Sequence, residues 1–407
     1  MMRLRRLAGV IVLVCLIWAA PAHADVVADW NAITTQTAVL VRPGPTSILD
    51  LAMVHAAMHD AIQAYDRRYE PYVVDIRHAS GSPVAAAASA AHDVLVAQFP
   101  EQAATFDGLL NDYLGARGLL GDPGVGVGQV AAAAIVNLRV GDGSFPSNPE
   151  IFTGGTNPGE WRPTLPAFAP MVSPWLGDVR PFVLQSSSQL RAPQPPPQLT
   201  SSEYTLDYNE VKALGSVNST DRTPEQTALA LFYSDNFLIL WQRTLRGISD
   251  ANITNLGDSA RLFALANLAA ADAAITAWNT KKYYNFWRPI TAIQEGYHDT
   301  NPETDGDRSW LPLIPTPAYG EYTSGANNLT GSMTRTLEHI FGDSMTFSVF
   351  STPVNTTITY QRFSDMAADV VNVRIYQGIH FRTADQVGRA QGTAASDWVV
   401  SHILRPF

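Results

Sequence analysis

The stretch "KKYYNFWRP" (residues 281–289) carries Lys281 and Arg288, separated by six residues, where a helical pattern runs into a proline. Pro289 ends the continuation of that helix, because proline lacks a backbone N–H and its ring clashes with the preceding turn. A guanidinium offers a planar fork that suits a tetrahedral oxyanion, and an ammonium adds a compact charge. By itself an Arg-Pro pair after aromatic residues is often only a helix stop. With other donors nearby, Lys281 and Arg288 become candidate oxyanion ligands.

A second block, "TSGA" (residues 323–326), supplies such donors. Ser324 adds a hydroxyl, and Gly325 has no side chain, so that a backbone N–H can approach an anion closely. A helical pattern follows, and the N-terminus of a helix favours negative charge. Ala326 occupies a position at which an acid–base group would be useful.

A third block, "RIYQGIHFRTAD" (residues 374–385), contains Arg374, His380 and Asp385. His380 is the group that could bond to the central atom of an anion, and Asp385 could orient its ring through the other nitrogen. Thr383 is a candidate N-cap of the final helix, which would place His380 just before a helix N-terminus. An isolated arginine is often solvated, and an isolated histidine is more often structural than catalytic. The three blocks therefore indicate an anion site only in combination.

Around these blocks, Ala-rich segments with helical spacing dominate, and alternating β-branched strand patterns are nearly absent. We therefore predict a mostly α protein built from helical bundles. The predicted helices are Ile48–Tyr65, Pro83–Phe99, Ala103–Leu114, Gly126–Val140, Thr223–Leu245, Ser259–Trp278, Asn327–Phe341, Tyr360–Ile375 and Ala384–Ile403.

A Pro-, Gly- and Ser-rich excursion at residues 141–202 interrupts the helical pattern. Its aromatic residues favour an ordered, packed segment, and the PPP run near its end favours a stiff connector. We place a boundary near residue 200. The N-terminal helical half would span residues 25–200, and the C-terminal half, residues 201–407, would carry the oxyanion site.

The first 24 residues, "MMRLRRLAGVIVLVCLIWAAPAHA", are typical of a signal peptide, with basic residues, a short apolar run and an Ala-His-Ala cleavage site. Cleavage predicts an exported protein and leaves 24 Lys+Arg against 37 Asp+Glu. This acidic balance argues against a nucleic-acid partner. Cys15, the only cysteine, lies in this segment, which excludes a thiol nucleophile or disulfide in the mature chain. No later apolar run is expected to span a membrane, and the helical faces of the N-terminal half could serve a homo-oligomer.

Lys-x6-Arg-Pro, then Ser-Gly, then Arg-x5-His resembles the signature of the vanadium-dependent haloperoxidase and type 2 phosphatidic acid phosphatase superfamily. "LAMVHAAMHDAIQAYDRRYEPY" (residues 51–72) and "AWNTKKYYNFWRPITAIQ" (residues 277–294) are similar to its soluble, exported bacterial haloperoxidases. The resemblance extends over most of the mature chain and implies a helical-bundle fold of the haloperoxidase and acid phosphatase type.

The resemblance also implies roles for single residues. His380 would bind vanadium in a peroxidase or attack phosphorus in a phosphatase, and Lys281 would polarise bound peroxide. The ligands of the equatorial oxygens of vanadate, or of phosphate in the same site, would be Lys281, Arg288, Ser324, Gly325 and Arg374. Two departures stand out: Ala326 replaces the usual histidine, and Asp385 follows His380 by five residues rather than four.

Three functions are consistent with these residues. The first is a haloperoxidase that binds vanadate and oxidises halide with hydrogen peroxide. The second is an acid phosphatase with a phosphohistidine intermediate. The third is an oxyanion-binding protein that lost turnover when Ala326 replaced the histidine, a group usually worth ~10²–10⁴-fold in rate.

Other polar residues are less informative. His55 and His59 lie one helical turn apart beside Asp60, where a buried polar contact between helices is favoured over a metal site. His339 is too far along its helix from Ala326 to replace the histidine, about 20 Å at 1.5 Å per residue. Arg382 or a tyrosine could partly fill that role, the candidates being Tyr283, Tyr284 and Tyr322.

Overall fold

The computed structural model describes residues 25–407, so the predicted signal peptide, residues 1–24, lies outside the described residues. The prediction of a mostly α protein is confirmed, since helices form most of the described chain and the strands are confined to one hairpin. The helices are α1 (Val26–Val41), α2 (Ser47–Asp66), α3 (Pro83–Gln98), α4 (Ala103–Gly115), α5 (Gly124–Arg139), α6 (Ser202–Gly215), α7 (Pro224–Phe232), α8 (Phe237–Asn252), α9 (Leu256–Tyr284), α10 (Pro289–Gln294), α11 (Gly325–Phe341), α12 (Phe363–Tyr376) and α13 (Arg382–His402).

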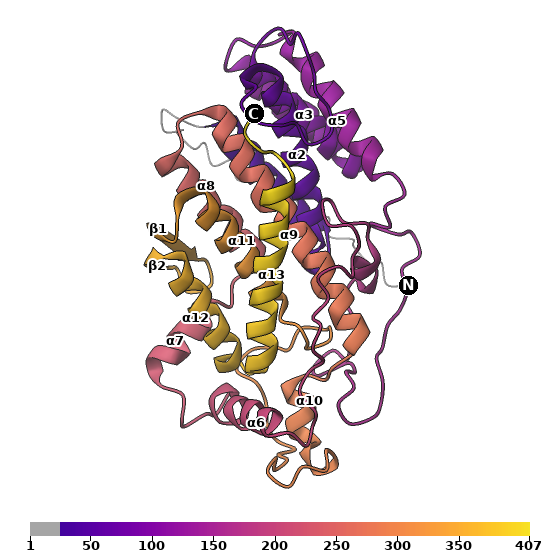
Figure 1. Cartoon of the computed structure of the whole chain (residues 1–407), viewed down its shortest axis with the longest axis vertical. Helices are drawn as coiled ribbons and strands as arrows, with labels where there is room; N and C mark the ends of the chain where they lie inside the picture. The colour runs from indigo at the N-terminus through magenta and orange to yellow at the C-terminus, as the bar shows by residue number, and fades with distance from the viewer. Residues whose placement is uncertain (1–24) are drawn as a thin grey trace, which may run out of the picture.

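The long helix α9 is the axis of the fold. It packs against α2 on one side and against α11 and α13 on the other, and Figure 1 shows it running beside α13. Eight of its 21 buried residues are alanine, which lets neighbouring helices approach closely. One continuous hydrophobic cluster extends from α1 to the C-terminal end of α13, so the two predicted halves share a core.

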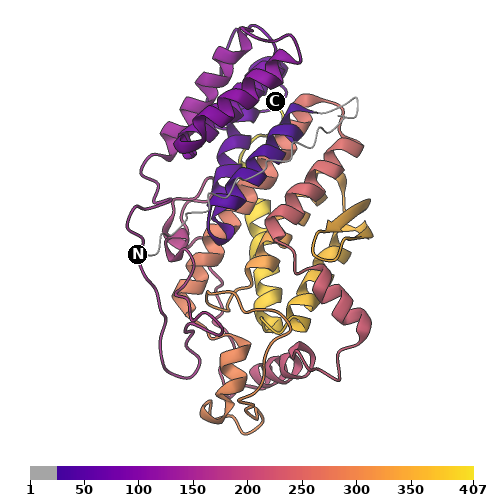
Figure 2. The ribbon, with the colours of Figure 1, turned by 180° about the vertical axis from the view of Figure 1, so that it is seen from behind.

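The two ends of the molecule are built differently. Helices α3 and α5 pack on each other and on α2 at one end, and α6 and α10 lie at the other, as Figures 1 and 2 both show. A second hydrophobic cluster around Tyr204, Trp287 and Phe381 ties α6 and α10 to the start of α13. The oxyanion blocks lie between these ends, where α9, α11 and α13 meet.

By length and composition α9 could cross a membrane, contrary to the expectation that no such segment follows residue 24. In the structure, 89% of its most apolar window is buried. It acts here as the core helix of the bundle.

The predicted helix Thr223–Leu245 is in fact two helices, α7 and α8. A capping box formed by Thr223 and Gln226 begins α7. The side chain of Asn236 then accepts a 2.9 Å hydrogen bond from the backbone N–H of Leu238 and begins α8. Asparagine favours such caps because its side chain satisfies the free N–H groups of a first turn, so the chain changes direction before Phe237.

The sequence prediction also missed an antiparallel hairpin, β1 (Ser344–Ser351) and β2 (Thr356–Arg362). The residues of β2 overlap the predicted helix Tyr360–Ile375, and α12 begins only at Phe363. Phe347 stacks on Tyr360 and Phe363, with ring centroids 5.7 and 4.8 Å away. The hairpin is short and one face is exposed, so its alternation was too weak to be recognised. Helices α1, α6 and α10 were missed as well.

The histidines of α2 are buried polar contacts. The side chain of Asn31 in α1 donates to Nε2 of His55 at 2.8 Å, and His59 donates from Nε2 to the carbonyl of Glu70 at 3.1 Å. Asp60 accepts three backbone N–H bonds from residues 72–74. Within residues 25–407, no group of three His, Cys, Asp or Glu side chains could hold a metal ion.

The burial of these two histidines makes their contribution to the free energy of unfolding sensitive to acid. Burial lowers the pKa of His55 to about 3 and that of His59 to about 4, from an ordinary 6.5. Both are neutral in the fold, so the stability they contribute is present above pH 6.5 and is lost as the pH falls toward these values, at about 1.4 kcal/mol per pH unit for each histidine. Buried carboxyls such as Asp50 and Asp272, whose pKa values are raised to about 6, act in the opposite sense, so the contribution of the histidines is measured as a difference between two proteins. In urea unfolding between pH 4 and 6.5, the unmodified protein should lose more stability, or gain less, on acidification than a variant with both histidines changed to glutamine. Identical pH dependence of the two proteins would contradict the assignment.

Candidate anion site

The cations of the site come from three helix ends. Lys281 lies in the last turn of α9, Arg288 is the N-cap of α10, and Arg374 lies in the last turn of α12. The end of α9 differs from the prediction: Asn285, in a left-handed conformation with φ 47°, stops it, and Pro289 is the first residue of the next helix. Proline suits that place because its missing N–H would be unpaired there anyway.

Lys281 is completely buried and lies against the segment that precedes α11. Its ammonium donates to the carbonyls of Gly320 and Glu321 at 2.7 and 3.1 Å, and lies 4.9 Å from the centre of the Tyr319 ring. Burial, followed by the nearby charge of Arg288, lowers the pKa of Lys281 well below its ordinary value. An anion bound beside it would offset both effects.

Arg288 is held by two backbone carbonyls and points one nitrogen at His380. Nε donates to the carbonyl of Tyr319 at 2.8 Å, and Nη1 donates to that of Ile379 at 2.7 Å. Nη1 also lies 3.0 Å from Nε2 of His380. The remaining nitrogen, Nη2, is buried and has no partner among the described residues.

Arg374 is likewise fixed at one nitrogen and unpaired at another. Its Nη1 donates to the side chain of Gln377 at 2.7 Å, and Gln377 is itself held by the carbonyl of Ala230. The buried Nε has no partner within the described chain. Unpaired buried N–H groups on two arginines are costly unless an acceptor meets them.

Ser324 and Gly325 begin α11. Ser324 is its N-cap and is completely buried, and Gly325 is its first residue. A Cβ on Gly325 would lie 3.3 Å from the Trp278 ring and 3.9 Å from Cε of Lys281. A side chain would therefore crowd the Trp278 ring and contact the lysine, whereas glycine leaves this space free at the N-terminus of the helix.

His380 lies between α12 and α13 and is held by Glu321. Its Nδ1 is 2.9 Å from Oε1 of Glu321, and the same oxygen accepts the backbone N–H of Phe381 at 2.9 Å. A carboxylate at Nδ1 and an arginine N–H at Nε2 select a neutral ring with its proton on Nδ1. Burial, then the charges of Arg288 and Lys281, lowers the pKa of His380 well below 6.5, which also favours the neutral form. The lone pair of Nε2 therefore faces the cations.

The interpretation of Asp385 was wrong: Glu321, not Asp385, holds the His380 ring. Because α13 begins at Arg382, Asp385 is directed toward α11, where its Oδ1 accepts the side-chain N–H of Asn327 at 2.8 Å. It supports the first turn of α11. The N-cap of α13 is Phe381 rather than Thr383.

A cavity of about 290 Å³ adjoins the cradle. Gly325, Ala326 and Arg374 contribute to its wall, together with apolar side chains of α8, α9 and α11. The methyl group of Ala326 thus faces open space beside the anion cradle, where a longer side chain would have room.

The residues suggested as substitutes for the missing histidine have other partners. Arg382 pairs with Glu210 at 2.7 Å. The hydroxyls of Tyr284 and Tyr322 donate to backbone carbonyls, and Tyr283 is exposed beneath Arg191.

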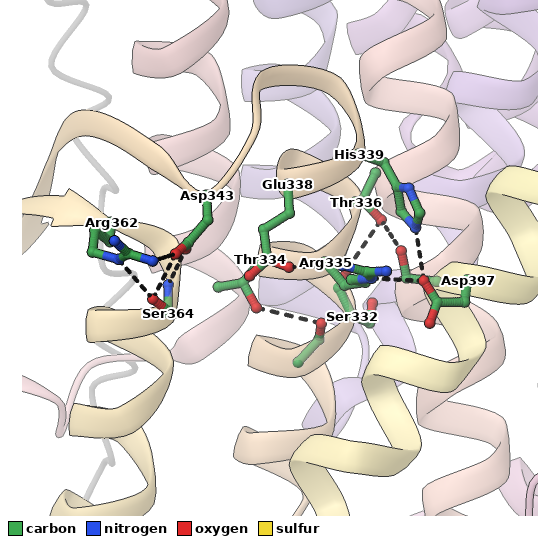
Figure 3. Close-up of polar contacts among 12 residues, drawn as sticks. Ser332, Thr334, Arg335, Thr336, Glu338, His339, Asp343, Arg362, Ser364 and Asp397 are labelled. Atoms are coloured by element: carbon green, nitrogen blue, oxygen red, sulfur yellow. Dashed lines mark hydrogen bonds and ion pairs between the residues drawn. The ribbon is translucent and has the colours of Figure 1, made fainter.

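His339 is engaged at the far end of α11. It pairs with Asp397 of α13 at 2.7 Å, as Figure 3 shows, and Asp397 also accepts from Arg335. It is remote from the cradle, as expected.

The donor set fits a tetrahedral oxyanion such as vanadate or phosphate. The set comprises three cationic side chains, the N-terminus of α11 and two arginine N–H groups without a partner among the described residues. Nε2 of His380 lies 3.0 Å from Nη1 of one of these arginines, Arg288. The predicted ligands come together in this one cradle, and Asp385 contacts Asn327 rather than His380. Glu321 was missed, although it stands only three residues before Ser324.

Comparisons with known proteins identify relatives. Residues 261–407 match the family model described as the VCPO second helical-bundle domain. The vanadium chloroperoxidase of Curvularia inaequalis is 30% identical over 37% of this chain, and the match spans only 29% of that protein.

Solved structures extend the likeness to nearly the whole chain. A bacterial vanadium-dependent iodoperoxidase superposes with a TM-score of 0.76 over 93% of this chain and 95% of its own, at 23% identity. The holo form of a bacterial vanadium-dependent chloroperoxidase gives 0.69 over 88% and 92%, at 19% identity. These superpositions establish the fold. Residues 261–407 thus resemble the second helical-bundle domain of vanadium chloroperoxidase, within a chain that has the fold of the vanadium-dependent haloperoxidases.

Proposed function

We propose that the protein is a vanadate-dependent haloperoxidase that oxidises halide with hydrogen peroxide. The observation that carries the proposal is the neutral His380, whose Nε2 lone pair faces a cradle of three buried cations. The named relatives add that proteins of this fold include vanadium chloroperoxidases and an iodoperoxidase. The proposal also places the mature protein outside the cytoplasm, on the evidence of residues 1–24.

Each side chain has a distinct task in this proposal. His380 binds the central atom through Nε2, and Glu321 keeps its proton on Nδ1. The unpaired N–H groups of Arg288 and Arg374 would hold oxygens of the anion, and Ser324 and Gly325 would hold them from the start of α11. Vanadate, when bound, would supply Lewis-acid activation of peroxide. The ammonium of Lys281 would donate a hydrogen bond to an oxygen on which negative charge develops.

The same cradle supports an acid phosphatase as the second candidate, with His380 as the nucleophile. Ala326 weighs against it, because it offers no proton to the leaving group, and Asp235, the carboxyl group in the cavity wall, is paired with Arg243. A haloperoxidase depends less on such an acid, because the metal itself activates peroxide as a Lewis acid. A third candidate is an oxyanion-binding protein without turnover.

One paired assay distinguishes the three candidate functions. Phosphate-free protein is divided into vanadate-loaded and unloaded samples, and each is tested for bromide oxidation with hydrogen peroxide and for aryl-phosphate hydrolysis. We expect bromide oxidation only after loading. Hydrolysis without vanadate, inhibited when vanadate is added, would instead assign a phosphatase. Tight binding of phosphate or vanadate with neither activity would leave the oxyanion-binding protein.

A further inference from the structure

Helix α5, at the end of the molecule remote from α6 and α10, presents an uncharged face to solvent. One side of the helix packs on α2 and α3, and the other side is exposed, including Val130 at 50% and, just past the helix end, Val140 at 73%. The single charged residue of the helix, Arg139, is 6% exposed and pairs with Asp142 at 2.6 Å. No described segment covers this face. An apolar face left in water on a folded protein is typical of an interaction surface.

The exposed positions of α5 have the spacing of a contact between two helices. Five exposed residues follow one another at alternating steps of four and three, and they are Gly126, Val130, Ala133, Asn137 and Val140. Steps of three and four keep residues on one side of a helix, and the same alternation lines the seam of paired helices. The 16 residues of α5 give this stripe a length of about 24 Å at 1.5 Å per residue. A second helix could therefore lie along the whole stripe.

Charge favours a second copy of this chain as the occupant of the stripe. The chain carries 27 Lys+Arg against 37 Asp+Glu, so two copies repel each other over much of their surface. An approach through α5 brings no like charges into contact. A twofold interface needs a patch that complements itself, and an uncharged apolar stripe meets that requirement. A strongly acidic or basic partner would find no opposite charge on this face.

The polar residues of α5 indicate how two copies would align. If two copies run antiparallel about a twofold axis at Ala133, residues equally far before and after Ala133 lie at the same level. Gln129 of one copy then lies level with Asn137 of the other, so their side-chain amides can form a hydrogen bond on each side of the axis. Val130 likewise lies level with Val136, and the two apolar side chains can pack. The antiparallel order also opposes the two helix dipoles, which a parallel pair would align.

We propose that the protein forms a twofold-symmetric dimer through α5, with the two copies of this helix antiparallel and closest at Ala133. Two such helix faces would bury on the order of 10³ Å² in total, near the lower limit of specific protein interfaces. We therefore expect a weak dimer, with a dissociation constant of roughly 10⁻⁶–10⁻⁵ M. The dimer does not depend on the proposed activity, because α5 contributes no residue to the anion cradle.

Sedimentation velocity measures the dimer directly. The purified protein should change from monomer to dimer between about 1 and 100 µM. Ala133→Arg would bring two like charges together at the twofold axis and should raise the dissociation constant roughly tenfold or more. The temperature of thermal unfolding should not change, because the position is exposed. The matched control is Ala251→Arg, at an exposed position of α8, which should dimerise like the unmodified protein.

Cysteine crosslinking tests the alignment, because residues 25–407 contain no cysteine. Ala133→Cys would place two thiols beside each other at the axis, within reach of a disulfide, and mild oxidation should give a covalent dimer. Gly126→Cys is the control on the same helix, where a Cβ meets nothing within 4 Å. Its two thiols would lie about 21 Å apart along the helices at 1.5 Å per residue, so it should not crosslink alone. Mixed with Val140→Cys, which lies level with it, it should crosslink.

Three results would overturn the proposal. The first is a protein that stays monomeric at the highest concentration, or a folded Ala133→Arg variant that dimerises as before. The second is equal crosslinking of Gly126→Cys and Ala133→Cys, which would exclude the antiparallel alignment. The third is a monomer that binds phosphatidylcholine vesicles and loses this binding in Ala133→Arg, which would assign the face of α5 to a lipid surface instead.

Discussion

Replacing His380 by alanine is expected to reduce turnover by on the order of 10³-fold or more, whichever of the two activities the protein has. Among the described residues, Nε2 of His380 is the one neutral nitrogen that directs a lone pair at the cradle. It would form the only bond between the protein and the central atom of the anion. Arg288, Lys281 and Arg374 would remain, so the variant should still bind phosphate or vanadate weakly through charge. Steady-state assays with and without vanadate, combined with dialysis of the anion, measure both parts.

The matched control is His339→Ala. That histidine pairs with Asp397 at the far end of α11, and its loss should leave both activities unchanged. Thermal unfolding must accompany the assay, because His380→Ala also leaves the buried Glu321 without the ring. A folded His380→Ala protein with full activity would show that the assignment of the site is wrong.

Changing Ala326 to histidine is expected to raise aryl-phosphate hydrolysis by ~10²-fold or more, the usual effect of a well-placed general acid. The new side chain would extend from the first turn of α11 into the cavity, beside Gly325 and Arg374. There it could protonate a leaving oxygen, which nothing in the present wall does. Initial rates on an aryl phosphate and on a poorer alkyl leaving group measure the gain, and the alkyl ester should gain more.

Ala326→Leu is the control, because it occupies similar space without a proton to donate. It should give no gain. If the histidine variant gives none either, residue 326 does not approach the leaving group.

The cradle could be predicted because each of its residues stands in a short block with a local signal. Arg288 precedes a proline, Gly325 follows a serine at a helix start, and His380 follows Arg374 by six positions. Helix ends place such groups with little dependence on distant parts of the chain. The long buried helices were also recognisable, since their alanine-rich pattern spans several turns.

Glu321 and the hairpin could not be predicted in this way. The contact between Glu321 and His380 joins residues 59 positions apart, and no local pattern distinguishes a buried carboxylate from a solvated one. Asp385 was the more obvious partner because it is near in sequence, but the start of α13 turns it toward Asn327. In the hairpin, the buried side chains of β1 become evident only when α12 and its aromatic residues are in place.

The placement of Lys281 at the end of α9 links the anion cradle to the opposite end of the molecule. The helix that carries this lysine also buries its apolar surface against α2, near the N-terminal end of the described chain. The matched family segment, residues 261–407, contains every cradle residue but not α2. Cut out alone, it would expose a helix apolar enough to insert into lipid or self-associate. The segment that carries the cradle therefore depends on the N-terminal half of its own chain, whose helix α2 covers the apolar surface of α9.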